Sequence, residues 1–324
     1  MAQPTLLILG GTGFIGRSIV ARLSAAGWRV RVPTRRLARA RALMPLPTVE
    51  VLECNINADG IIEHLTAGTE AVINLVGVLH GRRAEPWGAE FESAHVAIPR
   101  AVIAACRAHA VTRLLHMSAL GVGSAQPLPS MYLRSKAEGE RLVRDSGLAW
   151  TVFRPSVVFG AEDRFINLFG QLQRFSPFVP LAGANTRFQP IWVGDVAQAF
   201  VNALSRPETV GKVYELGGPQ VLRLREIVGL AGRLKGCRRP VIDLPDALGR
   251  LQAMLLSALP GPTLMSPDNL DSMKIDNVAE GPIAAELGIT PMSIEAGMTD
   301  PEAIRQRRRD SERAHARRSA QAER

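Results

Sequence analysis

Tyr132 and Lys136 lie four residues apart in the segment Tyr-Leu-Arg-Ser-Lys, and both side chains can hold or release a proton. On a helix this spacing places them on one face. A neighbouring ammonium lowers the pKa of a phenol, so the pair predicts that Tyr132 is a general acid or base for a carbonyl and its alcohol. Ser118, at the end of a predicted strand over residues 113–117, would hold the substrate oxygen. The alternative interpretation is an ordinary surface pair.

The first residues of the chain predict a dinucleotide site. Apolar residues 6–9 are typical of a strand buried on both faces of a parallel sheet, and a glycine-rich turn and a helical pattern over residues 14–26 follow it. Strand, turn and helix in this order bind a pyrophosphate, because the backbone of the turn and the free N–H groups of the helix can approach it closely. The predicted contacts are Gly10, Thr12, Gly13, Phe14, Ile15 and Gly16.

Two arginines indicate which dinucleotide is preferred. They follow a second predicted strand over residues 29–34, about 20 positions beyond the glycines, where an acidic residue would select NAD(H). Arg35 and Arg36 stand there instead, and their guanidinium groups suit a 2′-phosphate. We therefore predict NADP(H), with NAD(H) as the alternative. The two arginines could also form the start of a solvated helix.

Further cofactor contacts are expected where later strands end, because ligands bind at the carboxyl ends of parallel strands. The strands are predicted at residues 49–53, 71–75 and 148–154. Asn55 would bond the adenine or form a local Asx turn. Arg154 would lie near the cofactor or form a buried ion pair. Lys136 would bond the nicotinamide ribose. The remaining predicted cofactor contacts are Ile56, Val76, Gly77, Pro155 and Val157.

Composition indicates an ordinary soluble globular protein: of 324 residues, 46% are hydrophobic and 21% are charged. No apolar run approaches the ~20 residues that span a bilayer, and the chain enters its first strand without a basic leader. Cys54, Cys106 and Cys237 lack the spacing of metal ligands, which predicts free thiols in a reducing compartment and no metal site. We therefore expect a cytoplasmic protein.

The net charge of +9 is concentrated at the two ends of the chain. Residues 1–49 contain eight arginines and no acidic residue, and residues 301–324 contain eight arginines and four acidic residues. Either end could attract a phosphorylated cofactor, an anionic membrane surface or a protein partner. The tail at 301–324 shows no apolar periodicity and is predicted to be disordered. No nucleic-acid-binding module is recognisable, so we expect no nucleic-acid partner.

Three later features have more than one interpretation. Asp195 precedes an apolar pattern over residues 196–204 and is predicted to cap that helix. The apolar segment 246–259 would pack on its own domain, or lie in a membrane interface or against a partner. Several side chains between residues 163 and 187 would cover an apolar substrate pocket or pack in the core: Phe165, Phe169, Phe175, Phe178 and Pro180.

These motifs resemble the extended or atypical short-chain dehydrogenase/reductases, which include NAD-dependent epimerases and dehydratases. The resemblance spans about residues 5–296 and is carried by the glycine turn, Ser118, the Tyr132–Lys136 pair and Arg-Pro-Ser-Val-Val-Phe-Gly at 154–160. Segments 132–140, 159–167 and 187–197 resemble, more narrowly, atypical members related to the nucleotide-binding accessory subunit of respiratory complex I. The chain departs from the family by having one serine at the strand end, and Asn55 where relatives commonly have aspartate.

The resemblance implies an α/β fold, a doubly wound parallel sheet of Rossmann type with a smaller C-terminal substrate-side lobe. We expect the NADP(H)-binding domain at residues 1–158 with 188–217 returning to it, the lobe at 159–187 and 218–300, and the tail at 301–324. The implied activity is that of an NADP-dependent oxidoreductase or epimerase-like enzyme with a small apolar or quinone-related substrate, linked to complex I or quinone metabolism. The alternative is a non-catalytic NADPH-holding subunit of a respiratory complex, located at the inner face of the membrane.

Overall fold

A seven-stranded parallel sheet forms the centre of the computed structural model, which describes residues 5–163, 165–258, 263 and 265–299. The strand order is β11-β6-β5-β4-β1-β2-β3, and each neighbouring pair is parallel. Strand order reverses beside β1, as in doubly wound sheets, which confirms the predicted fold class. The strands are β1 (Thr5–Leu9), β2 (Arg29–Thr34), β3 (Val49–Glu53), β4 (Ala71–Asn74), β5 (Arg113–Met117), β6 (Ala149–Pro155) and β11 (Lys212–Leu216).

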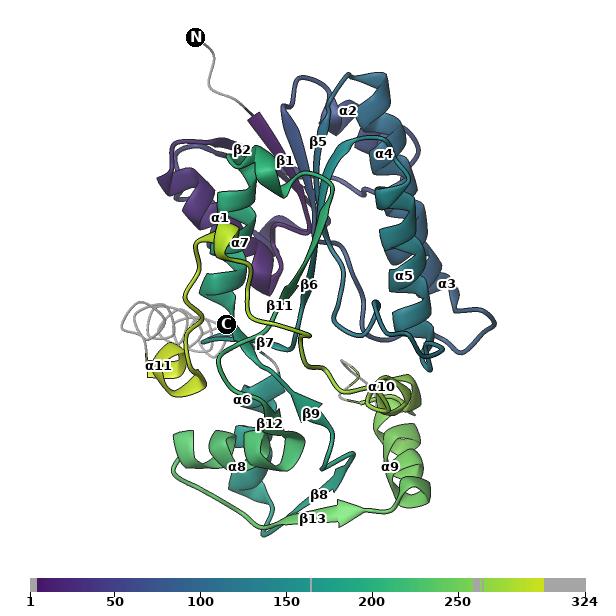
Figure 1. The fold of residues 1–324 in the computed structure, drawn as a ribbon, viewed down its shortest axis with the longest axis vertical. Helices are drawn as coiled ribbons and strands as arrows, with labels where there is room; N and C mark the ends of the chain where they lie inside the picture. Colours follow the sequence, from purple (N-terminus) through teal and green to yellow (C-terminus); the bar gives the residue numbers. More distant parts are fainter. Residues whose placement is uncertain (1–4, 164, 259–262, 264, 300–324) are drawn as a thin grey trace, which may run out of the picture.

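Helices cover both faces of this sheet, which is why its strands are apolar on both sides (Figure 1). Along β1, Leu6 and Ile8 belong to one core cluster, and Leu7 and Leu9 belong to the other. One face carries α1 and α7, which pack on each other, and the other carries α2, α4 and α5. These helices are α1 (Phe14–Ala25), α2 (Ile61–Thr66), α4 (Ile98–Ala108), α5 (Met131–Arg144) and α7 (Val193–Leu204). The short helix α3 (Ala89–Phe91) precedes α4 in the chain.

A smaller lobe lies beyond the carboxyl ends of the sheet strands, in the lower part of Figure 1. It has a core cluster of its own, which includes Phe159, Phe169 and Leu224. Its elements are β7 (Val158–Phe159), α6 (Phe165–Phe175), β8 (Val179–Ala182), β9 (Arg187–Phe188), β10 (Ile191–Trp192), β12 (Leu222–Arg223), α8 (Leu224–Leu234), β13 (Val241–Leu244), α9 (Asp246–Ala258), α10 (Pro267–Ser272) and α11 (Ile294–Thr299). Short 3-10 turns occupy Leu37–Arg39, Pro207–Thr209 and Ala285–Leu287.

Most predicted strands agree with the structure. Those over residues 29–34, 49–53 and 113–117 are confirmed, and the strand predicted at 148–154 is shifted by one residue. Glu92–Ala97 forms a π-helical turn between α3 and α4. Such wider turns are frequent at functional sites. The predicted tail, residues 301–324, lies outside the described residues.

Two local predictions are wrong. Asp195 does not cap its helix: α7 begins earlier, at Val193, and the Asp195 carboxylate accepts a hydrogen bond from the Met292 N–H at 2.8 Å. Phe175 and Phe178 do not pack in the core, since 88% and 43% of their surfaces are exposed. Phe165 and Phe169 do pack together, with ring centroids 5.3 Å apart. Among the described residues, no helix is long and apolar enough to cross a bilayer.

Candidate functional site

The turn between β1 and α1 forms a cradle for an anion. Gly10 has φ +81°, a conformation that favours glycine, and a Cβ on Gly16 would lie only 2.3 Å from the Gly10 carbonyl oxygen. Gly13 is the N-cap of α1, and no side chain caps this helix or places a carboxylate in its first turn. The backbone at Thr12–Gly16 is therefore close to a helix end whose dipole favours negative charge. All six residues predicted to contact the pyrophosphate lie here.

The two arginines predicted to select NADP(H) follow β2 at the same edge of the sheet. Arg35 and Arg36 are exposed, and within the described ranges neither guanidinium has a protein partner. A short helical turn begins at Leu37, directly after them. The two arginines therefore also fit the alternative interpretation, in which they form the start of a solvated helix. Asn55 forms the Asx turn, accepting a hydrogen bond from the Asn57 N–H at 3.2 Å. Its contact with adenine, and that of Ile56, stay predictions.

Lys136 reaches across to the ends of β4 and β5. Its Nζ donates to the Met117 carbonyl oxygen at 2.9 Å, and a Cβ on Gly77 would lie 3.1 Å from the same nitrogen. A side chain at position 77 would therefore crowd the lysine, whose Nζ would have to shift by a few tenths of an ångström. The preceding Val76 N–H donates to Asn74 Oδ1 at 3.1 Å. The structure thus brings Val76, Gly77 and Lys136 together at one point of the sheet edge.

Tyr132 lies one turn before Lys136 on α5, in an apolar setting. Its ring packs edge-on against His95, with centroids 5.6 Å apart, and against Phe91 at 6.4 Å. Burial raises the pKa of Tyr132 to about 12. Burial also lowers the pKa of Lys136 to about 8, against the opposing effect of Glu140. The prediction that Lys136 lowers the pKa of Tyr132 is wrong here, because burial dominates, and the phenol keeps its proton at neutral pH.

Ser118 is a buried hydroxyl with an unused hydrogen-bonding group. It is 3% exposed at the end of β5, and its Oγ has no partner among the described residues. The same holds for Nε2 of His116, whose Nδ1 is paired with the Asn74 amide at 3.2 Å. Buried polar groups are almost always paired, so such an exception points to a group that binds there. A substrate oxygen would satisfy the Ser118 hydroxyl.

His95 was not singled out from the sequence, yet it connects two parts of the site. Its Nε2 accepts from the Val78 N–H at 3.1 Å, and its Nδ1 pairs with Ser135 Oγ at 2.8 Å. Burial and the nearby Lys136 charge lower the pKa of His95 to about 2, so the ring is neutral. It therefore holds the loop after β4 against α5. The only sign of this role in the sequence was that a histidine stands among apolar residues of a helical pattern.

Asp268 and Asn277 are two further residues that the motifs did not reveal. The Asp268 carboxylate accepts from the N–H groups of Met131 and Tyr132, at 2.7 and 3.1 Å, and so fixes the start of α5. Asn277 Oδ1 accepts from the Val157 N–H at 3.1 Å. Both side chains come from the last part of the chain, far in sequence from the groups they hold. From the sequence alone, an aspartate after Ser-Pro is expected in the first turn of its own helix. This expectation gives no sign that Asp268 binds the first N–H groups of another helix, α5.

The end of β6 is held by ion pairs and backbone bonds. Arg154 bonds the buried Glu140 carboxylate at 2.6 and 3.0 Å and lies 3.7 Å from Glu215, which confirms the buried-ion-pair interpretation of this arginine. The Pro155 carbonyl accepts from the Leu120 N–H at 3.1 Å. Pro155 and Val157 therefore have fixed backbones at the sheet edge, and their contact with a nicotinamide stays a prediction.

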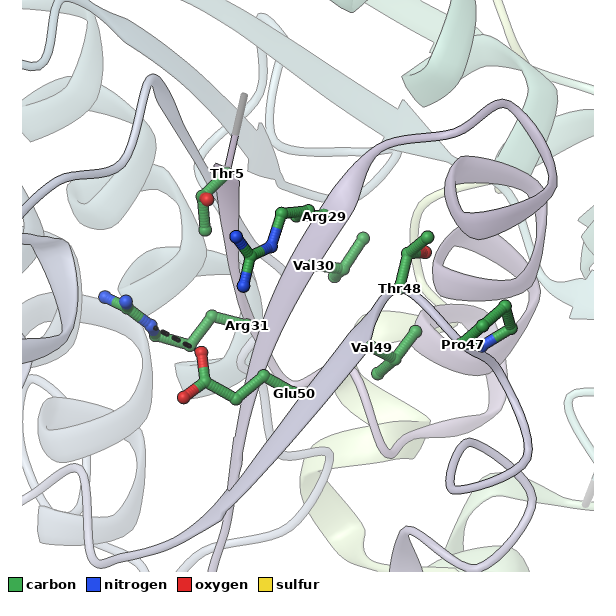
Figure 2. Close-up of a pocket in the computed structure, with 8 residues that line it drawn as sticks. All are labelled: Thr5, Arg29, Val30, Arg31, Pro47, Thr48, Val49 and Glu50. Atoms are coloured by element: carbon green, nitrogen blue, oxygen red, sulfur yellow. Dashed lines mark hydrogen bonds and ion pairs between the residues drawn. The ribbon is translucent and has the colours of Figure 1, made fainter. Parts of the chain in front are cut away.

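A polar hollow of about 240 Å³ lies elsewhere, where β1, β2 and β3 begin (Figure 2). Arg31 and Glu50 form an ion pair across it at 3.3 Å. This is the opposite edge of the sheet from Tyr132 and the glycine turn. The hollow has no part in the site. The described residues also contain no group of three potential metal-ligating side chains.

Comparison with known proteins agrees with this arrangement. Residues 6–217 match the NAD dependent epimerase/dehydratase family. Among solved structures, a dTDP-glucose 4,6-dehydratase from Streptomyces venezuelae with bound NAD has TM-score 0.69 and 21% identity, over 90% of this chain and 94% of that one. At this identity the likeness shows the fold alone.

Two relatives are more similar in sequence. A mitochondrial NADH dehydrogenase [ubiquinone] 1 alpha subcomplex subunit 9 from Mus musculus is 35% identical over 227 residues, 68% of this chain and 58% of that protein. The chain thus matches just over half the length of the mouse protein. A ceramide reductase from Caulobacter vibrioides is 32% identical over 248 residues, which cover 76% of this chain and 75% of the reductase.

Proposed function

Since the chain belongs to the NAD dependent epimerase/dehydratase family, as its motifs indicated, we propose that it is an NADP(H)-dependent reductase that converts an apolar carbonyl compound to its alcohol. One observation carries the proposal. Tyr132 is a protonated phenol, with its pKa raised to about 12, on the helix face that also presents Lys136. A protonated acid beside a cation suits the reduction of a carbonyl rather than the oxidation of an alcohol.

NADP(H) fits the residues that are present, since the glycine cradle, the two unpaired arginines and the Gly77 backbone all lie at one sheet edge. When bound, it supplies the hydride. Ser118 donates its hydroxyl hydrogen bond to the substrate oxygen. Tyr132 then transfers its phenolic proton to that oxygen, and the phenolate that this transfer leaves takes a proton back from solvent.

NADP(H) is proposed over NAD(H) because Arg35 and Arg36, at the end of β2, have no partner among the residues that the structure describes. The apolar class of substrate is supported by the ceramide reductase among the relatives. A quinone-related carbonyl belongs to the same class. We also propose the division into a nucleotide-binding domain, 1–158 with 188–217, and a substrate-side lobe, 159–187 with 218–300.

The test is a single turnover of the NADPH-loaded protein, followed by nicotinamide absorbance, with membrane lipid extract, quinones and small carbonyl compounds as challenges. Tyr132→Phe should slow oxidation of NADPH by about 100-fold or more, because the proton donor is lost. The matched control is Tyr214→Phe, since Tyr214 is the chain's other tyrosine and bonds Glu286 in the sheet core at 2.6 Å. Equal oxidation by wild type and Tyr132→Phe would refute the catalytic role.

A second candidate function rests on the 35% identity to a complex I subunit. In this version the protein holds NADPH without turnover and binds a respiratory complex at the inner, cytoplasmic face of the membrane. This version predicts that NADPH stays bound to the protein during gel filtration. It also predicts that the bound NADPH is not oxidised by any of the quinones and carbonyl compounds tested. If wild type and Tyr132→Phe co-purify equally well with a respiratory complex, this version would be favoured.

A further inference from the structure

The helix α9 exposes its large apolar side chains and buries its small ones. Leu248, Leu251, Met254 and Leu255 are 52–63% exposed, whereas Gly249 and Ala253 are buried. These four lie at helical spacing on one face, and the buried face packs on β8, where a Cβ on Gly249 would come within 2.7 Å of the Ala182 Cβ. A helix of a soluble protein normally has the reverse pattern. The leucine face of α9 therefore has no partner among the residues that the structure describes.

This face belongs to a wider apolar end of the lobe. We call it the apolar end and define it as the four exposed side chains of α9 together with four from other elements. It contains eight of the thirteen large hydrophobic side chains that are exposed in the described chain. β8 connects the segments, since α9 and β13 both pack on it and the loop after α6 leads into it (Figure 1). The four further members are Leu172, Phe175, Phe178 and Ile242.

Arginines lie beside part of the apolar end. Arg174 precedes the exposed Phe175, and a hollow of about 680 Å³ beside β13 is lined by Arg225, Arg233, Arg238 and Arg239, with Glu226 and Glu295. Within the described part of the chain, no carboxylate lies at ion-pair distance from Arg174, Arg233 or Arg238. The nearby Asp243 is already paired with Arg225 at 3.0 Å. Arginines outnumber carboxylates in this hollow, so the charge on this side of the apolar end is mainly positive.

We propose that the apolar end docks on an anionic lipid bilayer. Exposed leucines and phenylalanines would enter the boundary between headgroups and acyl chains, and the arginines beside them would bind lipid phosphates. α9 has 13 residues and would lie along the surface, because at about 1.5 Å per residue it is too short to span. Docking is independent of hydride transfer, so it can hold or fail whatever the fate of the reductase proposal.

Sedimentation of the full-length protein with vesicles tests the proposal. The vesicles are phosphatidylcholine alone, or phosphatidylcholine with phosphatidylglycerol. Wild type should bind the anionic vesicles, and the double variant Leu251→Glu/Leu255→Glu should lose about tenfold or more of this affinity. Met44→Glu is the matched control, because Met44 is 51% exposed but lies between β2 and β3, away from the lobe. It should bind as wild type does.

Three outcomes would overturn the proposal. The first is that anionic vesicles do not retain wild type at all. The second is that the double variant and wild type bind them equally, which would assign the binding to charge elsewhere in the chain. The third is that wild type forms a dimer that the double substitution disrupts while neither protein binds vesicles, which would make the face a contact between copies. Unchanged thermal unfolding of the double variant shows that its fold is intact, and Tyr132→Phe should bind vesicles as wild type does.

Discussion

Lys136 has a low pKa for a lysine, because it is buried at the site. Its pKa is lowered to about 8 from 10.5. In the unfolded chain the ammonium is solvated and keeps its ordinary pKa. Between about pH 8 and 10.5 the unfolded chain therefore binds more protons here than the folded one. Stability from this group rises with pH across that window and is lost as the pH falls through 8.

We predict that the difference in unfolding free energy between wild type and Lys136→Met grows by about 3 kcal/mol from pH 8 to pH 10.5. Urea unfolding of the nucleotide-free protein at several pH values measures it. The comparison cancels other groups that titrate in this range. A difference that stays constant from pH 7 to 10.5 would mean that the folded lysine has an ordinary pKa.

At the scale of single elements, α10 positions the helix that carries Tyr132. The Asp268 carboxylate holds the first two N–H groups of α5, and it is 8% exposed. Asp268→Ala leaves these donors without a partner, and such a loss costs about 1–3 kcal/mol. We predict destabilisation in that range and slower single-turnover oxidation of NADPH, because Tyr132 loses its fixed position.

Asp271→Ala on the same helix is the control for this prediction. Its carboxylate forms ion pairs with Arg250 and Lys274 at 2.8 Å, away from α5. Partly exposed pairs of this kind contribute little, so we expect a loss below about 1 kcal/mol and an unchanged rate. If both variants behaved alike, the role assigned to Asp268 in positioning Tyr132 would be wrong.

Elements with local signals were predictable from the sequence. The apolar run of β1, the glycine turn and the four-residue spacing of Tyr132 and Lys136 are each contained in one short segment, so their physics is visible there. Asp195, Asp268 and Asn277 were not predictable, because their partners lie 97 to 137 residues away. The direction of the shift in the Tyr132 pKa was predicted wrongly for a related reason. Spacing shows a neighbouring cation, but only the packed structure shows how much burial opposes it.

For α9 the sequence left two interpretations open. Apolar periodicity shows that a helix has an apolar face, but it does not show whether that face packs on the core or is exposed to solvent. The structure shows that the leucines point outward and the small residues inward. The apolar segment thus belongs to the surface. Similarly, the π-helical turn at Glu92–Ala97 has no local signal in the sequence. His95 within this turn bonds Ser135, and its carbonyl lies against Gly139, and both partners are about 40 residues away in the chain.

At the scale of the whole molecule, the predicted nucleotide contacts span the ends of β1, β2, β3, β4 and β6. Binding there would stabilise the whole sheet by mass action. At a concentration about 100-fold above Kd, NADPH adds about 2.7 kcal/mol. For a chain of this size that corresponds to a rise in Tm of about 4 °C.

We predict that NADH at the same concentration raises Tm less than NADPH, because it lacks the phosphate that Arg35 and Arg36 would bind. Arg35→Ala should weaken NADPH binding by about tenfold or more and leave NADH binding unchanged, since hydrogen bonds to charged groups are worth about 1.5–3 kcal/mol. Arg29→Ala is the matched control, because Arg29 is exposed at the other end of β2. Equal shifts with NADH and NADPH in wild type would remove the preference for NADP(H), and the glycine cradle would then bind either nucleotide through the pyrophosphate that both contain.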